Sequence, residues 1–165
     1  MRSVAKSIRQ NLRVRDAMTA PAVTATPETT LEEIARLMLA DRIGCVVIVS
    51  PDEPERPVGI VTETDFDVAD DPIPFTFFRW PKLFGKSVWS ESSLEDVYEV
   101  SRRRSAESIM SAPVVTVEAD APLWDAVELM VGNEIKRLPV VVGDRLVGIV
   151  TRHYLLKCLV PVSLD

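Results

Sequence analysis

Two stretches of the chain share one order of apolar and polar positions, and that order predicts the same elements twice. Apolar residues recur at helical spacing over 31–39 and over 123–131, which indicates one core-facing helix in each stretch. A short continuous apolar run, 45–49 or 138–142, follows each helix, as expected for a strand that is buried on both faces. The apolar positions of the two predicted helices are Leu31, Ile34, Ala35, Met38 and Leu39, and Leu123, Ala126, Val127, Met130 and Val131.

The segments around these helices also correspond. Each helix is preceded by a short opening turn and an extended piece, and each buried run is followed by a second strand. Thr29 or Thr30, and Asp120, are the expected N-caps, and a last helix is expected to begin at Thr62 or Thr151. The pattern predicts an α+β fold of two β-α-β-β-α repeats. The opening turns are 14–18 and 106–110, the extended pieces 22–25 and 114–117, and the second strands 57–61 and 146–150.

The amino acids themselves repeat as well. Met18-Thr-Ala-Pro-Ala-Val-Thr24 returns as Met110-Ser-Ala-Pro-Val-Val-Thr116, and Val58-Gly-Ile-Val-Thr62 returns unchanged as Val147-Gly-Ile-Val-Thr151. A repeated supersecondary unit usually means that the copies pack on each other.

Composition narrows the class of protein. The 165 residues carry a net charge of −6 and contain 47% hydrophobic residues, which suits a folded domain and argues against a general nucleic-acid binder. No apolar run approaches the roughly 20 residues that span a bilayer, and no signal core is present at the N-terminus. Two cysteines are too few for a disulfide framework. We therefore expect a cytoplasmic protein without a membrane role.

Two segments lie outside the repeats. Residues 1–13 form a basic lead-in, interpreted as a solvated helix or as a contact for an acidic partner. Residues 70–105 form an insert with a connecting helix. The first part of this insert is rich in proline, and residues 75–89 hold six of the ten aromatic residues of the chain. A disordered linker would be poor in aromatics. The insert is therefore expected either to pack on the protein itself or to contact a partner.

The order V-x-D-x-M-[ST]-x-x-x-x-T, amphipathic helix, buried strand and V-G-I-V-T resembles the CBS (cystathionine-β-synthase) domain. The M-[ST]-x-x-x-x-T and V-G-I-V-T parts occur in both copies, at 14–69 and 106–165, while the second copy has Ala106 and Ser108 where the first has V-x-D. The chain therefore resembles a tandem CBS pair, or Bateman module. The resemblance implies two repeats packed with pseudo-twofold symmetry and a regulatory rather than catalytic protein. It also implies a homodimer that binds AMP, ADP, ATP, S-adenosylmethionine or a related adenosyl ligand between the repeats.

The candidate ligand site is Thr62 with Asp65. A strand that runs into a helix N-terminus favours a phosphate, and a carboxylate can accept hydrogen bonds from both hydroxyls of a ribose. The spacing Thr-x-x-Asp also fits a helix capping arrangement, and the two roles can coexist. By resemblance, Val23 and Thr24, and Val115 and Thr116, are expected to line the adenine.

The second repeat departs from this pattern. Tyr154 stands where the acid belongs after Thr151, while Lys136 and Arg137 supply cations that the first repeat lacks. Whether one ligand uses both sets of residues stays open.

No motif supports catalysis or a bound metal. The chain has one histidine, no phosphate-binding glycine loop and no cysteine pair with metal-ligand spacing. The resemblance to CBS pairs therefore implies a regulatory adenosyl-ligand module with no obligatory cofactor. The alternatives are a ligand-free interaction or dimerisation scaffold that uses the aromatic insert to bind an unidentified protein partner, and, more weakly, a nucleic-acid accessory protein.

Overall fold

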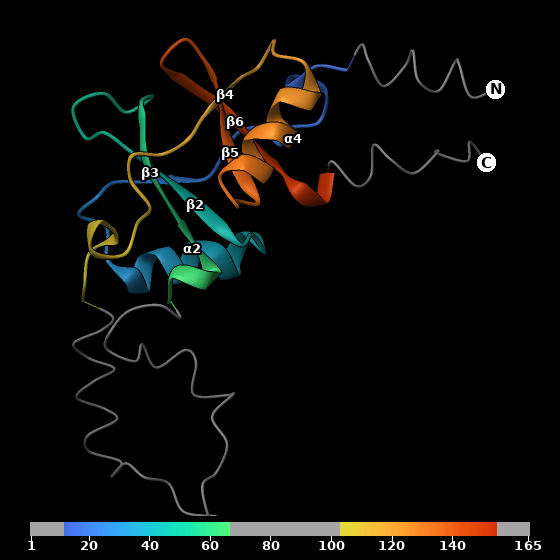
Figure 1. Cartoon of the computed structure of the whole chain (residues 1–165). Coiled ribbons are helices and arrows are strands. Elements are labelled where there is room, and N and C mark those ends of the chain that lie inside the picture. The colour runs from blue at the N-terminus through green and yellow to red at the C-terminus, as the bar shows by residue number, and fades with distance from the viewer. Residues whose placement is uncertain (1–11, 67–102, 155–165) are drawn as a thin grey trace, which may run out of the picture. The chain divides into compact units, whose positions relative to one another are not determined.

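The computed structural model describes residues 12–66 and 103–154, whose helices and strands are labelled in Figure 1. Two similar mixed α/β repeats with one three-stranded sheet each confirm the predicted α+β class. The first repeat contains η1 (Val14–Asp16), β1 (Thr24–Ala25), α2 (Leu31–Asp41), β2 (Cys45–Val49), β3 (Pro57–Thr62) and η2 (Glu63–Phe66). The second contains η5 (Ala106–Ser108), β4 (Val117–Glu118), α4 (Leu123–Gly132), β5 (Arg137–Val142) and β6 (Arg145–Thr151).

Both sheets have the same strand order, β1-β2-β3 and β4-β5-β6. The short first strand pairs in parallel with the central strand, with Thr24 opposite Val47 and Val117 opposite Val140. All five residues of β2 are buried, which explains its unbroken apolar sequence. β5 and β6 are antiparallel and are joined through Gly143, whose φ of +63° suits glycine in a tight turn.

Helix α2 begins at a capping box. The Thr30 hydroxyl accepts a hydrogen bond from the Glu33 N–H (3.3 Å), and the Glu33 carboxylate accepts one from the Thr30 N–H (3.1 Å). Leu31, Ile34 and Met38 point from this helix into the core, as predicted.

The expected cap of α4 was wrong. Its N-cap is Pro122, not Asp120, and the Asp120 carboxylate instead pairs with the Arg15 guanidinium at 2.5 Å. The Leu123 N–H at the start of α4 donates to the Leu12 carbonyl oxygen, so the backbone of another segment replaces a capping side chain.

The last predicted core position of each helix was also wrong. Leu39 is 77% exposed and Val131 is 74% exposed. At 100° per residue, Leu39 lies roughly 100° from the mean direction of Leu31, Ile34 and Met38, so it falls outside the buried stripe. Val131 has the same position in α4.

The opening turns are exchanged between the repeats. Thr19 forms two backbone hydrogen bonds with Ile149 of β6 (2.8 and 2.9 Å). In the corresponding place, Ser111 forms two with Ile60 of β3 (2.9 and 3.2 Å). Each opening turn thus extends the sheet of the other repeat, and its apolar residues enter that core: Val14 and Ala17 join the core of the second repeat, and Ala106 joins that of the first.

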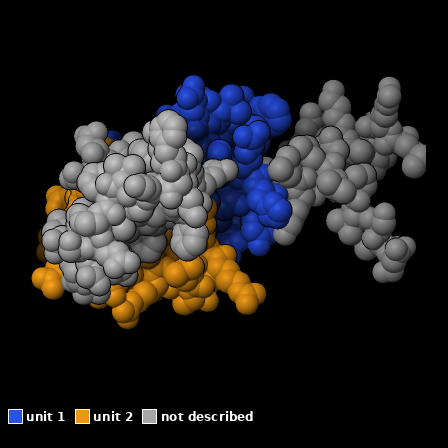
Figure 2. Space-filling view, turned by 90° about the horizontal axis from the view of Figure 1, so that it is seen from below, with its two compact units in different colours: residues 1–22, 54–57, 113–165 blue, residues 23–53, 58–112 orange. Residues whose placement is uncertain are grey.

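Because of this exchange, the compact units do not follow the sequence repeats. One unit comprises residues 1–22, 54–57 and 113–165, and the other comprises 23–53 and 58–112 (Figure 2). Within residues 12–66 and 103–154, no helix has the length and apolar character needed to cross a membrane. Most of the insert 70–105 and nearly all of the lead-in 1–13 lie outside the described residues, as does Cys158.

Candidate functional site

One end of the first sheet carries the candidate residues of that repeat. Thr62 ends β3, and the Glu63 N–H that follows it donates to the Gly44 carbonyl oxygen just before β2 (3.2 Å). On the other side of β2, the Val23 carbonyl oxygen accepts from the Val47 N–H (3.0 Å), and Thr24 opens β1. The two flanking strands are therefore separated by β2 alone, about 9–10 Å apart.

Thr62 holds the carboxylate of Asp65. The Asp65 Oδ2 atom accepts hydrogen bonds from the Thr62 N–H (2.6 Å) and the Thr62 hydroxyl (2.9 Å). Both residues are half-buried. These bonds satisfy the backbone group at the start of η2 in the manner of a helix cap, which was one of the two predicted roles of the pair.

The arrangement also leaves one oxygen of the Asp65 carboxylate able to accept hydrogen bonds from a ligand. Among the described residues, the Asp65 Oδ1 atom has no hydrogen-bond partner, while Oδ2 is fixed in place. The Thr64 hydroxyl lies 2.8 Å from that of Thr62 and extends the polar cluster. Sequence reasoning missed Thr64, although the alternation Thr62-Glu-Thr64 at the end of an apolar strand could have indicated it.

The second repeat brings its own predicted residues together. Thr151 is the β6 residue paired with Arg137 of β5, and the Arg152 N–H donates to the Lys136 carbonyl oxygen (2.8 Å). This bond repeats the one between Glu63 and Gly44. Lys136 is exposed and Arg137 is half-buried, while Val115 and Thr116 are half-buried just before β4.

Tyr154 distinguishes this repeat chemically. It is 36% exposed and lies edge-on to the ring of His153, with 6.3 Å between the ring centroids. No carboxylate follows Thr151 at the spacing of Asp65 from Thr62. The two repeats therefore share the backbone hydrogen bond at this end of the sheet but carry different side chains.

The described residues contain no group of three His, Cys, Asp or Glu side chains that could hold a metal ion. Cys45 is a buried thiol at the start of β2. The candidate residues thus form two separate sets, one in each compact unit. The unit of residues 23–53 and 58–112 holds Val23, Thr24, Thr62 and Asp65, and the unit that includes 113–165 holds Val115, Thr116, Lys136, Arg137 and Thr151.

Curated relatives match most of the chain. An uncharacterized protein of Methanopyrus kandleri, MK0525, is 36% identical over 136 residues, which cover 82% of this chain and 56% of that protein. The chain spans between 34% and 56% of the length of the first three curated relatives it matches.

Solved structures share the fold. The CBS domain of a CBS-domain-containing membrane protein from Sphaerobacter thermophilus has a TM-score of 0.76 at 34% identity, with 96% of this chain and 94% of that one covered. PAE2072 from Pyrobaculum aerophilum, a CBS domain protein complexed with AMP, has a TM-score of 0.62 at 23% identity, with 90% and 98% covered. The family model described as CBS domain matches residues 14–69 and 106–161. The chain therefore belongs to the CBS domain family and carries the domain as a tandem pair.

Proposed function

We propose that this chain is a regulatory CBS protein, not an enzyme, and that it binds an adenine nucleotide or a related adenosyl compound through Thr62 and Asp65. The observation that carries the proposal is the half-buried Asp65 carboxylate, with Oδ2 held by Thr62 and Oδ1 left without a partner among the described residues. The AMP complex of the structurally similar PAE2072 supports the ligand class.

The chemistry of the ribose fits this carboxylate. The two vicinal hydroxyls of a ribose can donate to one carboxylate, and hydrogen bonds to an ionised group are the strong ones. The Thr62 hydroxyl donates to Asp65 in this structure, so it would have to turn away from that carboxylate to donate to a phosphate oxygen. Val23 and Thr24, on the other side of β2, would line the adenine.

The second repeat is proposed to take a different ligand or to bind more weakly. Lys136, Arg137 and Thr151 offer donors to an anionic group, and Val115 and Thr116 offer a partly apolar wall. Tyr154 cannot accept two ribose hydroxyls in the way that a carboxylate does. Regulation further requires that the ligand bind two states of the protein or its partner with different affinity.

Isothermal titration calorimetry with AMP, ADP, ATP and S-adenosylmethionine tests the proposal. Asp65→Ala should weaken the affinity for the bound ligand by about 10- to 100-fold, the equivalent of one or two hydrogen bonds to a charge. Asp125→Ala, which removes an exposed carboxylate from α4, is the matched control and should leave the affinity unchanged. An unchanged affinity in Asp65→Ala, or no binding of any of the four, would overturn the proposal.

A dimerisation scaffold is the second candidate function. Trp124 is 66% exposed and Val131 is 74% exposed, and their spacing of seven places them on one face of α4. Large exposed apolar side chains that gather on one face often mark a protein contact. Light scattering should show a dimer for the parent chain and a monomer for Val131→Asp if this face joins two copies. A monomeric parent would remove this candidate.

A further inference from the structure

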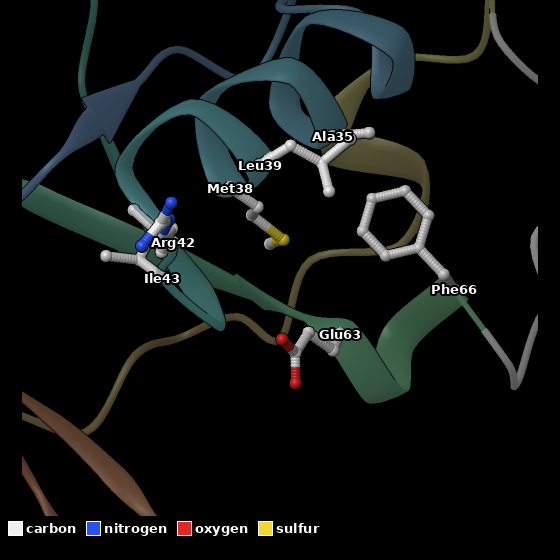
Figure 3. A pocket seen from close by; sticks show the side chains of 7 residues that line it. All are labelled: Ala35, Met38, Leu39, Arg42, Ile43, Glu63 and Phe66. Atoms are coloured by element: carbon white, nitrogen blue, oxygen red, sulfur yellow. The ribbon is translucent and has the colours of Figure 1, made fainter.

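An apolar pocket of about 460 Å³ lies between α2 and η2 (Figure 3). Its apolar walls are side chains of α2 and its C-terminal end together with the ring of Phe66, and Arg42 and Glu63 are its two charged lining residues. The pocket is separate from the candidate nucleotide residues: none of Val23, Thr24, Thr62 and Asp65 lines it. Its lining residues are Ala35, Met38, Leu39, Arg42, Ile43, Glu63 and Phe66.

Part of the apolar surface of the pocket is exposed to water, and burying it against another group would be favourable. Leu39 is 77% exposed beside it, and each Å² of apolar surface left in water forfeits about 25 cal/mol relative to burial. A volume in this range is also large enough to receive a bulky group. An aromatic side chain is well suited to it, because aromatic rings bury much apolar area with few rotatable bonds.

The course of the chain indicates which group is within reach. The described part of the first repeat ends at Phe66, which itself lines the pocket. The next described residue is Arg103, and the Arg104 carbonyl oxygen accepts a hydrogen bond from the Leu31 N–H at the start of α2 (2.8 Å). The intervening residues 67–102 are therefore connected at both ends to residues that lie beside the same helix, α2, which has 11 residues and is about 16 Å long.

The composition of that tethered segment matches the pocket. Residues 75–89 contain six of the ten aromatic side chains of the chain. Tethering at both ends gives these side chains an effective concentration on the order of millimolar at the pocket, which a free partner would rarely reach.

We propose that the pocket between α2 and η2 is the docking site of an aromatic side chain from residues 75–89 of the same chain. The inference does not depend on nucleotide binding, because it uses no residue of the candidate site.

Hydrogen–deuterium exchange on the full chain tests the proposal. In the parent, part of 75–89 should exchange at least tenfold more slowly than an unstructured peptide. Leu39→Asp, which puts a charge on the wall of the pocket, should remove that protection. Ala40→Asp adds the same charge at the next exposed position of α2, which does not line the pocket, and should preserve the protection. Since Leu39 is largely exposed, its substitution should not prevent folding.

A photo-reactive amino acid at position 39 gives an independent measurement, and it should crosslink to a peptide within 75–89 of the same chain. The proposal is overturned if 75–89 exchanges at the unprotected rate in the parent, or if Leu39→Asp and Ala40→Asp behave alike. Protection that rises with protein concentration, or a crosslink between two chains, would assign the pocket to a second copy instead.

Discussion

The carbonyl oxygen of Thr19 lies so close to Gly148 that a Cβ atom on the glycine would be 2.7 Å away from it. The Met18 Sδ atom would lie 2.9 Å from the same Cβ. The closeness follows from the two hydrogen bonds between Thr19 and Ile149, which draw the opening turn of the first repeat onto β6. Gly59 has the equivalent place in the first sheet, where its neighbour at 2.6 Å is the Met110 Sδ atom. The repeated V-G-I-V-T element therefore needs its glycine for packing.

The two glycines should tolerate alanine differently. Gly148→Ala presses on a hydrogen-bonded backbone oxygen that cannot move without breaking the pairing, so we expect a loss of about 3 kcal/mol in the free energy of unfolding. Gly59→Ala presses mainly on the end of a flexible methionine side chain, and we expect a loss of about 1 kcal/mol. Urea unfolding of both variants measures the difference. Equal losses would mean that Met110 is as rigid as the Thr19 backbone.

A second pair of glycines separates backbone conformation from packing. Gly143 and Gly132 both have no atom within 4 Å of an added Cβ, but only Gly143 has a positive φ, of +63°. Gly143→Ala should therefore lower the free energy of unfolding by about 1 kcal/mol. Gly132→Ala, in the last turn of α4, should raise it by about 0.5 kcal/mol, because alanine is the better helix former. Thermal unfolding of the two variants should show melting temperatures that move in opposite directions.

The repeat, the strands and the helix faces could be predicted because each depends on local periodicity. The strand predicted at 45–49 is β2 itself, and β3, β5 and β6 agree with their predicted ends within one residue. β1 and β4 begin two and three residues later than the extended pieces predicted at 22–25 and 114–117. The exchange of the opening turns could not be predicted in this way. The apolar pattern around Val14 and Ala106 predicts that both residues are buried. Nothing in the local sequence indicates which of the two similar sheets each residue packs on.

The candidate site, too, could be predicted only in part from the local sequence. The pair Thr62 and Asp65 could be found from its spacing, and so could its two competing roles. The capping bonds depend on the rotamer of Asp65 and on where η2 begins, which the spacing does not determine. Asp120 was wrongly predicted to cap α4, because the local sequence does not show its true partner either. Its charge suits a helix start, but its partner is Arg15, more than 100 residues away in the sequence.

The capping box of α2 gives a third prediction. Thr30→Ala removes the oxygen that accepts the Glu33 N–H, and the loss of such an N-cap costs about 1 kcal/mol. Thr19→Ala is a matched control, since it removes an exposed hydroxyl for which the structure gives no hydrogen bond. Urea unfolding at pH 7 should show the loss in Thr30→Ala and little change in Thr19→Ala. If both variants unfold like the parent, the cap contributes nothing measurable.

The same box predicts a dependence on pH. Hydrogen bonds from the Thr30 N–H and then from its hydroxyl hold the pKa of Glu33 below its usual value of 4.5. A carboxyl with a lowered pKa in the folded state stabilises the fold fully above its unfolded pKa, and this contribution is lost as the pH falls through the folded pKa. Glu33→Gln should therefore be less stable than the parent at pH 7, and the difference should shrink below about pH 4.5. A difference that stays constant from pH 7 to pH 3 would contradict the assignment.

The difference between the repeats provides a gain-of-function test of the proposed site. The end of β6 repeats the end of β3, because Arg152 and Glu63 donate equivalent hydrogen bonds to the carbonyl oxygens of Lys136 and Gly44. Tyr154→Asp would place a carboxylate three residues after Thr151, as Asp65 follows Thr62. If that carboxylate is what the second repeat lacks, the number of adenosyl ligands bound per chain in calorimetry should rise from one toward two.

Tyr154→Phe is the control for this variant, because it removes the phenol oxygen without adding an acid, and it should leave the stoichiometry at one. Combining Tyr154→Asp with Asp65→Ala should then move the ligand to the second repeat and keep one per chain. A stoichiometry unchanged by Tyr154→Asp, in a chain whose first site binds normally, would mean that the acid alone does not define the site. The cause would then lie in side chains that differ around the two sheet ends, with Lys136 and Arg137 in one repeat where Gly44 and Cys45 stand in the other.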